Sequence, residues 1–429
     1  MFGKRLSIAL ALVAVVAAAE AAAQTVYVVQ HAKIVTVSGP TIPDGSVVIT
    51  DGRIAEVGAA VAVPPGATII DARGLTVYPG LFDPDSGIGL GEAAAETNLG
   101  QFVPQLSPTT SFVTQSDTIP LARTAGVTHI LLRMGRNTIP GQADLLSLAG
   151  WTAEEMVVKR GVATPLAFPT VGEVQYTDDE RFAVTPWSTL KTQYERRLTQ
   201  LKDFFASARA YMKASEQSAG SAARNQQFEA MIPVLKREEV VIIDTQNHVD
   251  IRNAVQFAKD ENLDYVIAAP TGAWRVADFL KANAVRVLIG STQAYPDAED
   301  DAYDSVYRTA EALHAKGVPF AFSTLANRLA LPRLFPQSVG KAIAFGLPYD
   351  VALRAATLNA AEFFGVADRL GSIDKGKIAN LVVVAGDIFD TRSTIEHVFI
   401  NGEPISLRSR ETELYERFKA RPAPKKTAK

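Results

Sequence analysis

The segment from Tyr78 to Gly87, with the sequence Tyr-Pro-Gly-Leu-Phe-Asp-Pro-Asp-Ser-Gly, divides the chain into two patterns. Before it, short alternating apolar runs separated by turn residues predict β-strands. After it, continuous apolar runs alternate with segments of helical period, which predicts repeated strand and helix pairs. The segment is therefore predicted to be the junction between a small β-domain and a larger α/β domain.

The small β-domain is predicted to combine both ends of the chain. Between Thr25 and Tyr78, Asp51-Gly52 separates two apolar runs and is a strong signal for a type I′ hairpin. The same pattern returns in the runs Leu381–Val384 and Ile395–Ile400 and in the turn at Asn401-Gly402. The sequence therefore predicts a composite β-sandwich domain built from residues 24–78 and 372–407.

Residues 79–371 are predicted to form a barrel of alternating strands and helices. The strand-like runs are Val127–Leu132, Val240–Ile243, Tyr265–Ala268, Val285–Ile289 and Val318–Phe322. Such short continuous apolar runs are typical of parallel strands buried on both faces, and this many of them favour a closed barrel. A long helix predicted from Trp187 departs from this repeat, and we expect it to cover the active-site face or to contact another subunit.

Composition limits the partners and the compartment. A net charge of -3 and a pI near 6.0 give no electrostatic footprint for nucleic acid, so a small-molecule partner is expected. The chain has no cysteine, which excludes disulfides and thiolate ligands. Lys4 and Arg5 precede an apolar run from Leu6 to Ala19, shorter than the ~20 residues of a bilayer-spanning helix. Residues 1–23 are therefore predicted to be a signal peptide without a membrane anchor, which implies a secreted, periplasmic protein, and residues 408–429 a charged, disordered tail.

Two parts of the chain carry a resemblance to a known family. Pro79-Gly80-Leu81-Phe82-Asp83 resembles the first barrel strand of the amidohydrolase superfamily, and residues 345–382 resemble the closing helix and return strand of its imidazolonepropionase-like branch. The resemblance covers nearly the whole mature chain. It implies a TIM (β/α)8 barrel with a composite β-sandwich domain, and a hydrolase that acts on carbon-nitrogen bonds other than ordinary peptide bonds.

The resemblance also implies where a metal site would lie. Amidohydrolases hold one or two divalent metals, zinc above all, at the mouth of the barrel, and the metal activates a water. The family's ligand positions on strands one, five, six and eight are occupied here by Asp85 and Gly87, by Asp244, by Ala269 or Pro270, and by Ser323 or Thr324. None of these is the family's residue, so the metal-ligand motif is degenerate.

Three residues remain candidates for a rebuilt metal site. Asp85 and Asp244 could hold a hard cation such as Mg, Ca or Mn through oxygen, although Asp at a strand end is also common as a helix cap. His248 follows the strand that carries Asp244, and loops at a barrel mouth often carry function. The other four histidines are interpreted as structural or surface residues. The hydroxyls near strand ends, Ser86, Ser291, Ser323 and Thr324, are interpreted as partners of local backbone groups.

A separate stretch suggests a ligand pocket. Residues 141–151 resemble a segment of exported members of the same branch, and Asn137, Gln142 and Trp151 could line a substrate pocket there. The alternative is that the stretch packs a loop against the barrel. One sequence does not separate the two.

Two functions from different classes follow. The first is an exported hydrolase with a rebuilt metal site that includes Asp85 and Asp244. The second is a catalytically inactive barrel, a pseudoenzyme, that binds a small ligand or pairs with an active relative in a hetero-oligomer. A homodimer is also expected from the family, with the long helix from Trp187 as a plausible contact.

Overall fold

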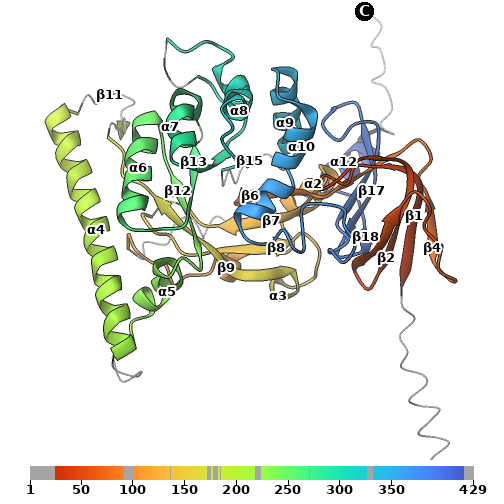
Figure 1. The fold of residues 1–429 in the computed structure, drawn as a ribbon, viewed down its shortest axis with the longest axis horizontal. Helices are drawn as coiled ribbons and strands as arrows, with labels where there is room; N and C mark the ends of the chain where they lie inside the picture. The colour runs from red at the N-terminus through yellow and green to blue at the C-terminus, as the bar shows by residue number, and fades with distance from the viewer. Residues whose placement is uncertain are drawn as a thin grey trace, which may run out of the picture.

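The structure, a computed structural model, describes residues 25–90, 100–135, 137–171, 175–176, 182–183, 185–217, 224–269, 271–296, 298, 300–325 and 332–419. The predicted signal peptide and the last ten residues of the predicted tail lie outside these ranges. Two eight-stranded sheets dominate the molecule, and helices cover one of them (Figure 1). Within the described part of the chain, no helix is both long and apolar enough to span a bilayer.

The first sheet confirms the composite β-domain. Its strands are β1 (Val26–Ile34), β2 (Ile42–Thr50), β3 (Arg53–Gly58), β4 (Thr68–Asp71), β5 (Thr76–Pro79), β16 (Leu381–Ala385), β17 (Thr394–Ile400) and β18 (Glu403–Ile405). Their order is β18-β17-β16-β5-β1-β2-β3, and β4 pairs with β1. The antiparallel ladder between β5 and β16, with Tyr78 opposite Val382, joins the two ends of the chain.

Both predicted hairpin turns are present in this sheet. Asp51 and Gly52 between β2 and β3 have φ angles of 51° and 76°, and Asn401 and Gly402 between β17 and β18 have 53° and 80°. Positive φ at both central residues is the signature of the type I′ turn. The two turns also touch, since a Cβ built on Gly402 would lie 2.4 Å from the Cα of Gly52. The sheet therefore curls until its two hairpins meet.

The second sheet is the barrel. Its strands are β6 (Leu81–Ser86), β7 (Val127–Arg133), β8 (Ala143–Ser147), β9 (Val157–Ala167), β12 (Val240–Asp244), β13 (Tyr265–Ala269), β14 (Arg286–Ile289) and β15 (Phe320–Phe322), which lie side by side in this order. The five runs predicted as strands are all present, each within two residues of its predicted bounds. The eight strands form a nearly closed barrel of the TIM type.

One strand departs from the expected parallel arrangement. β8 runs antiparallel to both β7 and β9. Two short segments join β8 to its neighbours, residues 134–142 and 148–156. Both are shorter than the crossover of a dozen or more residues that a parallel pair needs. The segment 141–151, considered above as a pocket or a packed loop, thus contains the five-residue barrel strand β8 and a short connection on each side of it.

Side chains seal the barrel between its last and first strands. No backbone ladder is recorded between β15 and β6. Instead the Thr324 amide donates to Asp83 Oδ1 at 3.0 Å and the Thr324 hydroxyl to Asp83 Oδ2 at 2.6 Å. The Phe82 amide donates to the carbonyl of Ala356, just before α11 (Leu358–Phe363). Residues of α11 also join the core cluster that fills the barrel.

Most helices cover the outer face of the barrel. They are α2 (Thr118–Thr124), α3 (Ala153–Met156), α5 (Gln226–Leu235), α6 (His248–Asp260), α7 (Ala277–Ala282), α8 (Ser305–Ala315), α9 (Phe335–Ala344) and α10 (Tyr349–Ala355), whereas α11 joins the inner cluster and α12 (Arg410–Lys419) lies in the predicted tail. The predicted long helix is α4 (Trp187–Gln217), at the edge of the molecule opposite the β-domain (Figure 1). Its buried residues Leu201, Phe205 and Ala208 belong to the outer core.

A buried carboxyl group lies at the base of β12. Glu239 is 3% exposed, and its Oε1 accepts a hydrogen bond from the Thr164 hydroxyl at 2.6 Å. Burial raises the pKa of Glu239 from 4.5 to about 7; the Thr164 bond opposes this rise and the nearby carboxylate of Asp144 adds to it. The folded protein therefore binds this proton more tightly than the unfolded chain does.

We predict that the contribution of Glu239 to stability falls as pH rises from about 4.5 to 7 and that Glu239→Gln removes this contribution. At about 1.4 kcal/mol per pKa unit, the variant should gain up to about 3 kcal/mol of unfolding free energy at pH 8 and little at pH 4.5. Urea unfolding at the two pH values measures this. The exposed neighbour gives a control, Glu238→Gln, and an equal effect of Glu239→Gln at both pH values would contradict the prediction.

A second prediction concerns the contact between the two hairpins. Gly402→Ala places a methyl group against the Gly52 backbone, whereas Gly66→Ala at nearly the same φ of 79° meets nothing within 4 Å. Both variants should lose about 1 kcal/mol for positive φ, and Gly402→Ala at least about 1 kcal/mol more. Denaturant unfolding of the pair measures the difference. Equal losses would mean that the hairpin contact is not close.

Candidate functional site

Strand alternation aims two charged side chains into the mouth of the barrel. Leu131 on β7 and Ile242 on β12 belong to the cluster inside the barrel, whereas Leu132 and Ile243 do not. Because side chains along a strand alternate between its faces, Arg133 and Asp244 point inward, two residues beyond Leu131 and Ile242. Both lie at the carboxyl ends of their strands, where TIM barrels place their functional residues.

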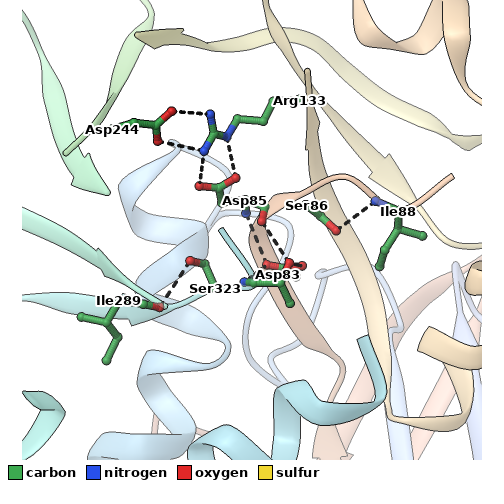
Figure 2. A network of polar contacts seen from close by, with 9 residues as sticks. Asp83, Asp85, Ser86, Ile88, Arg133, Asp244, Ile289 and Ser323 are labelled. Atoms are coloured by element: carbon green, nitrogen blue, oxygen red, sulfur yellow. Dashed lines mark hydrogen bonds and ion pairs between the residues drawn. The ribbon is translucent and has the colours of Figure 1, made fainter. Parts of the chain in front are cut away.

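Arg133 lies between two carboxylates, as Figure 2 shows. Its Nε and Nη2 donate to Oδ1 and Oδ2 of Asp85 at 2.5 and 2.9 Å. Its Nη1 and Nη2 donate to Oδ2 and Oδ1 of Asp244 at 2.7 and 2.8 Å. We call Arg133, Asp85 and Asp244 the arginine clamp. Each of its four carboxylate oxygens accepts a charge-assisted hydrogen bond, the strong bidentate geometry of arginine and carboxylate.

The clamp is largely removed from water. Asp85 is fully buried and Arg133 is 4% exposed, while the Asp244 side chain keeps 27% of its surface exposed. Burial alone would lower the pKa of Arg133, but the two carboxylates outweigh it and raise the pKa above its usual range. The guanidinium therefore stays charged, and this charge balances one of the two carboxylates that it contacts.

A second polar layer lies directly below the clamp. The Thr324 hydroxyl contacts Asp83 Oδ2 and, at 3.1 Å, the backbone oxygen of Asp85. Burial raises the pKa of Asp83 to about 6, and its hydrogen bonds with Thr324 limit the rise. The candidate hydroxyls all have local partners: Ser86 accepts from the Ile88 amide, Ser323 donates to the Ile289 carbonyl (Figure 2), and Ser291 contacts Ser338. The interpretation as partners of local backbone groups fits Ser86, whereas the Thr324 hydroxyl bonds the carboxylate of Asp83, which is far away in the sequence.

His248 does not join the clamp. It is the first residue of α6, where Asn247 caps the helix by accepting from the amides of Val249 and Asp250. The Nδ1 atom of His248 is buried and has no hydrogen-bond partner in the described structure. His129 lies inside β7, and burial lowers its pKa to about 3, so it is neutral.

The residues of the barrel mouth do not fit a divalent metal in this arrangement. All four oxygens of Asp85 and Asp244 are already bonded to Arg133. A dication between them would face a buried positive charge at hydrogen-bond distance from its ligands. Among the residues that the structure describes, no three His, Asp or Glu side chains converge to hold a metal. The strand-six position Ala269 is apolar, and Pro270 lies outside the described residues.

The three candidate pocket residues are not brought together. Gln142 precedes β8 and Trp151 follows it, so they lie toward opposite ends of that strand. Trp151 is 90% exposed and its amide donates to Glu155 Oε2. Asn137 lies beyond the end of β7 and lines a cavity at the barrel mouth that neither of the other two lines. Gln142 directly precedes Ala143, which pairs with Arg133 at the end of β7, so Gln142 and Asn137 both lie on the mouth side and Trp151 lies at the other end of β8.

Sequence reasoning missed Arg133. The predicted strand ended at Leu132, one residue short of it. Extending the period-2 pattern from Leu131 would have placed Arg133 on the inner face, next to two carboxylates that needed a counter-charge.

The clamp gives a prediction for stability. Arg133→Met leaves two carboxylates without their partner and should lower the unfolding free energy by about 3–5 kcal/mol. The triple variant, which combines Arg133→Met with Asp85→Asn and Asp244→Asn, removes all three charges and should recover most of this lost unfolding free energy. Urea unfolding of both variants tests it. A single variant that loses less than about 1 kcal/mol, or a triple variant no better than the single one, would contradict the buried ion pairing.

Comparison with known proteins shows which proteins this chain resembles. The model of the amidohydrolase family matches residues 275–405. No curated protein matches the chain. A solved amidohydrolase from Thermotoga maritima MSB8 is 23% identical with a TM-score of 0.76, and the match covers 89% of this chain and 100% of that one.

More distant solved structures share the fold. A prolidase complexed with N-methylphosphonate-L-proline is 18% identical with a TM-score of 0.53, covering 89% of this chain and 100% of that one. An adenosine deaminase from Xanthomonas campestris with bound zinc is 15% identical with a TM-score of 0.51, covering 88% and 92%. The match to the amidohydrolase family model is confined to residues 275–405, and the solved structures show that most of the chain shares the fold of these proteins.

Proposed function

We propose that this protein is a catalytically inactive member of the superfamily, in which the arginine clamp takes the place of the metal centre. The observation that carries the proposal is the bidentate contact of Arg133 with both Asp85 and Asp244. Family membership supports descent from hydrolases. The chemistry at the mouth supports a barrel that binds a small ligand or a partner instead.

A bound metal ion activates water, and a guanidinium does not. A bound dication lowers the pKa of water from about 15.7 toward 7 and polarises the scissile carbonyl. Arg133 carries a single delocalised charge and has no open coordination position. Four of its five N–H groups already donate to Asp85 and Asp244. The clamp thus holds the mouth together and offers no activated nucleophile.

The location and the partner are part of the same proposal. The N-terminal pattern of Lys4, Arg5 and the apolar run Leu6–Ala19 supports export to the periplasm. The first turns of α4, where Trp187 is 67% exposed, offer a contact for a second copy or for an active relative. A small molecule remains the expected ligand of the mouth.

The second candidate is a hydrolase of carbon-nitrogen bonds, which the family match favours. It requires Arg133 to leave Asp85 and Asp244 so that both carboxylates can bind a metal. Breaking this buried pair costs several kcal/mol, which metal binding would have to supply. The two candidates therefore differ in the metal content of the folded protein.

Elemental analysis of the mature protein, from Gln24 onward, separates them. After purification with zinc and manganese present, we expect zinc, iron, manganese, nickel and calcium all far below one ion per chain. The Asp85→Ala/Asp244→Ala variant should give the same background. About one tightly held metal per wild-type chain that disappears in the variant, together with hydrolysis of an N-acyl amino acid or a dipeptide, would overturn the proposal in favour of the hydrolase.

A further inference from the structure

A cavity of about 410 Å³ lies between the β-domain and the barrel. Its volume is within the ~300–1,000 Å³ of small-molecule sites, which often lie where two domains meet. Tyr78, which lines it, lies just before the amino end of β6, whereas Asp85 of the clamp is near the carboxyl end of that strand. The cavity is therefore at the end of the barrel opposite the arginine clamp. We propose that it binds a free α-amino acid with an apolar side chain.

The sheet of the β-domain supplies one wall of the cavity. Ala32 and Ile34 belong to the core cluster of the β-domain. Because side chains alternate along a strand, Lys33 of β1 and Val35 directly after it point to the opposite face of the sheet. Val35 and Tyr78 both pack with the outer core cluster of the barrel, so this face of the sheet is the one that meets the barrel. The sheet thus brings a cationic, an aliphatic and a phenol side chain to the cavity.

The facing wall carries two carboxylates, and hydrogen bonds hold one of them. Asp387 Oδ1 accepts from the Tyr349 hydroxyl at 3.1 Å and from the Phe389 amide at 2.8 Å. The same Tyr349 hydroxyl lies 3.2 Å from the hydroxyl of Tyr78, so this wall is tied to the sheet. Burial raises the pKa of Tyr349 well above its usual range, so its hydroxyl stays protonated and can donate to Asp387. Asp350, the next residue in the first turn of α10, brings the second carboxylate.

The cavity thus carries charges of both signs. Lys33 brings the positive charge, and Asp350 and Asp387 bring the negative ones. Among the residues that the structure describes, Lys33 forms no ion pair with either carboxylate. A ligand with one sign of charge would therefore meet a like charge as well as an opposite one. A zwitterion can place its carboxylate at Lys33 and its ammonium at the two aspartates, and both contacts are charge-assisted hydrogen bonds.

Apolar side chains complete the lining. Val35, Val37 and Leu353 line the cavity together with the two tyrosines. An apolar ligand group that is removed from water against these side chains adds to the affinity. An α-amino acid with an apolar side chain is the simplest ligand that carries a carboxylate, an ammonium and such a group.

This inference goes beyond the proposed function, because the cavity and the arginine clamp lie at opposite ends of the barrel. Metal content and hydrolysis decide the proposed function, whereas amino-acid binding is measured by titration without any catalytic readout. Either can therefore fail while the other stands.

The experiment is isothermal titration of the mature chain with L-leucine and with L-phenylalanine, each accompanied by two matched probes. The amines isoamylamine and phenethylamine lack the carboxylate, and the acids isocaproate and hydrocinnamate lack the ammonium. We expect saturable binding of at least one amino acid. Its matched amine and its matched acid should each bind at least roughly tenfold more weakly, because each loses one charge-assisted hydrogen bond.

Two variants test which side chain holds which end of the ligand. Lys33→Gln should weaken the amino acid at least roughly tenfold and should not weaken the amine, because the amine has no carboxylate to lose. Asp350→Asn should weaken both the amino acid and the amine, and should not weaken the acid. A variant that had merely lost its fold would weaken all the probes alike.

Lys202→Gln is the control, since it removes one positive charge from an exposed site on α4, which does not line the cavity. It should keep the wild-type affinity, and circular dichroism confirms that each variant is folded. The proposal is overturned if neither amino acid binds with a Kd below about 1 mM. It is also overturned if the amine or the acid binds as well as the amino acid, or if Lys33→Gln or Asp350→Asn binds the amino acid as the control does.

Discussion

The arrangement of the charged side chains at the mouth of this barrel depends on one guanidinium, that of Arg133. Asp85 and Asp244 come from strands that are not neighbours in the sheet, and both are held by Arg133 from β7. A buried carboxylate without a partner is costly, so the three side chains stabilise the site only as a set. In a metalloenzyme the ion draws its ligands together. Here the Arg133 side chain holds the two carboxylates together. Its guanidinium is a cation that is covalently part of the chain.

The clamp also lies beside the seam of the barrel. Asp83 and Asp85 are two residues apart on β6, and Thr324 after β15 contacts the carboxylate of the first and the backbone of the second. The same short segment therefore closes the barrel and orients the clamp. Two backbone groups at this seam, the Thr324 amide and the Asp85 oxygen, are thereby satisfied by side chains in place of a ladder between β15 and β6.

Much of the architecture could be predicted from local patterns. The five barrel strands, the long helix α4 and both type I′ turns follow from periodicity and from the residues that tolerate positive φ, which are properties of short segments. The direction of β8 could not be predicted in this way, because a short apolar run does not reveal which way its strand runs. The direction of β8 is indicated by the short segments that connect it to β7 and β9.

The site was predictable only in part. Asp85 and Asp244 were placed correctly at the mouth, since each follows a recognisable strand. Their partner was missed because the contact depends on the stagger of strands around the barrel, which brings Arg133 level with both. Gln142 and Trp151 were grouped by closeness in sequence, and a five-residue strand then separated them.

The pairing of β5 with β16 has a consequence for how the chain matures. The β-domain cannot be completed until the last strands have been synthesised, because Tyr78 lies opposite Val382. Contacts this distant in sequence form late, after a large loop has closed. A ribosome therefore releases the whole barrel segment before its companion sheet can assemble. Until then, the edge of β5 that pairs with β16 stays without its partner strand.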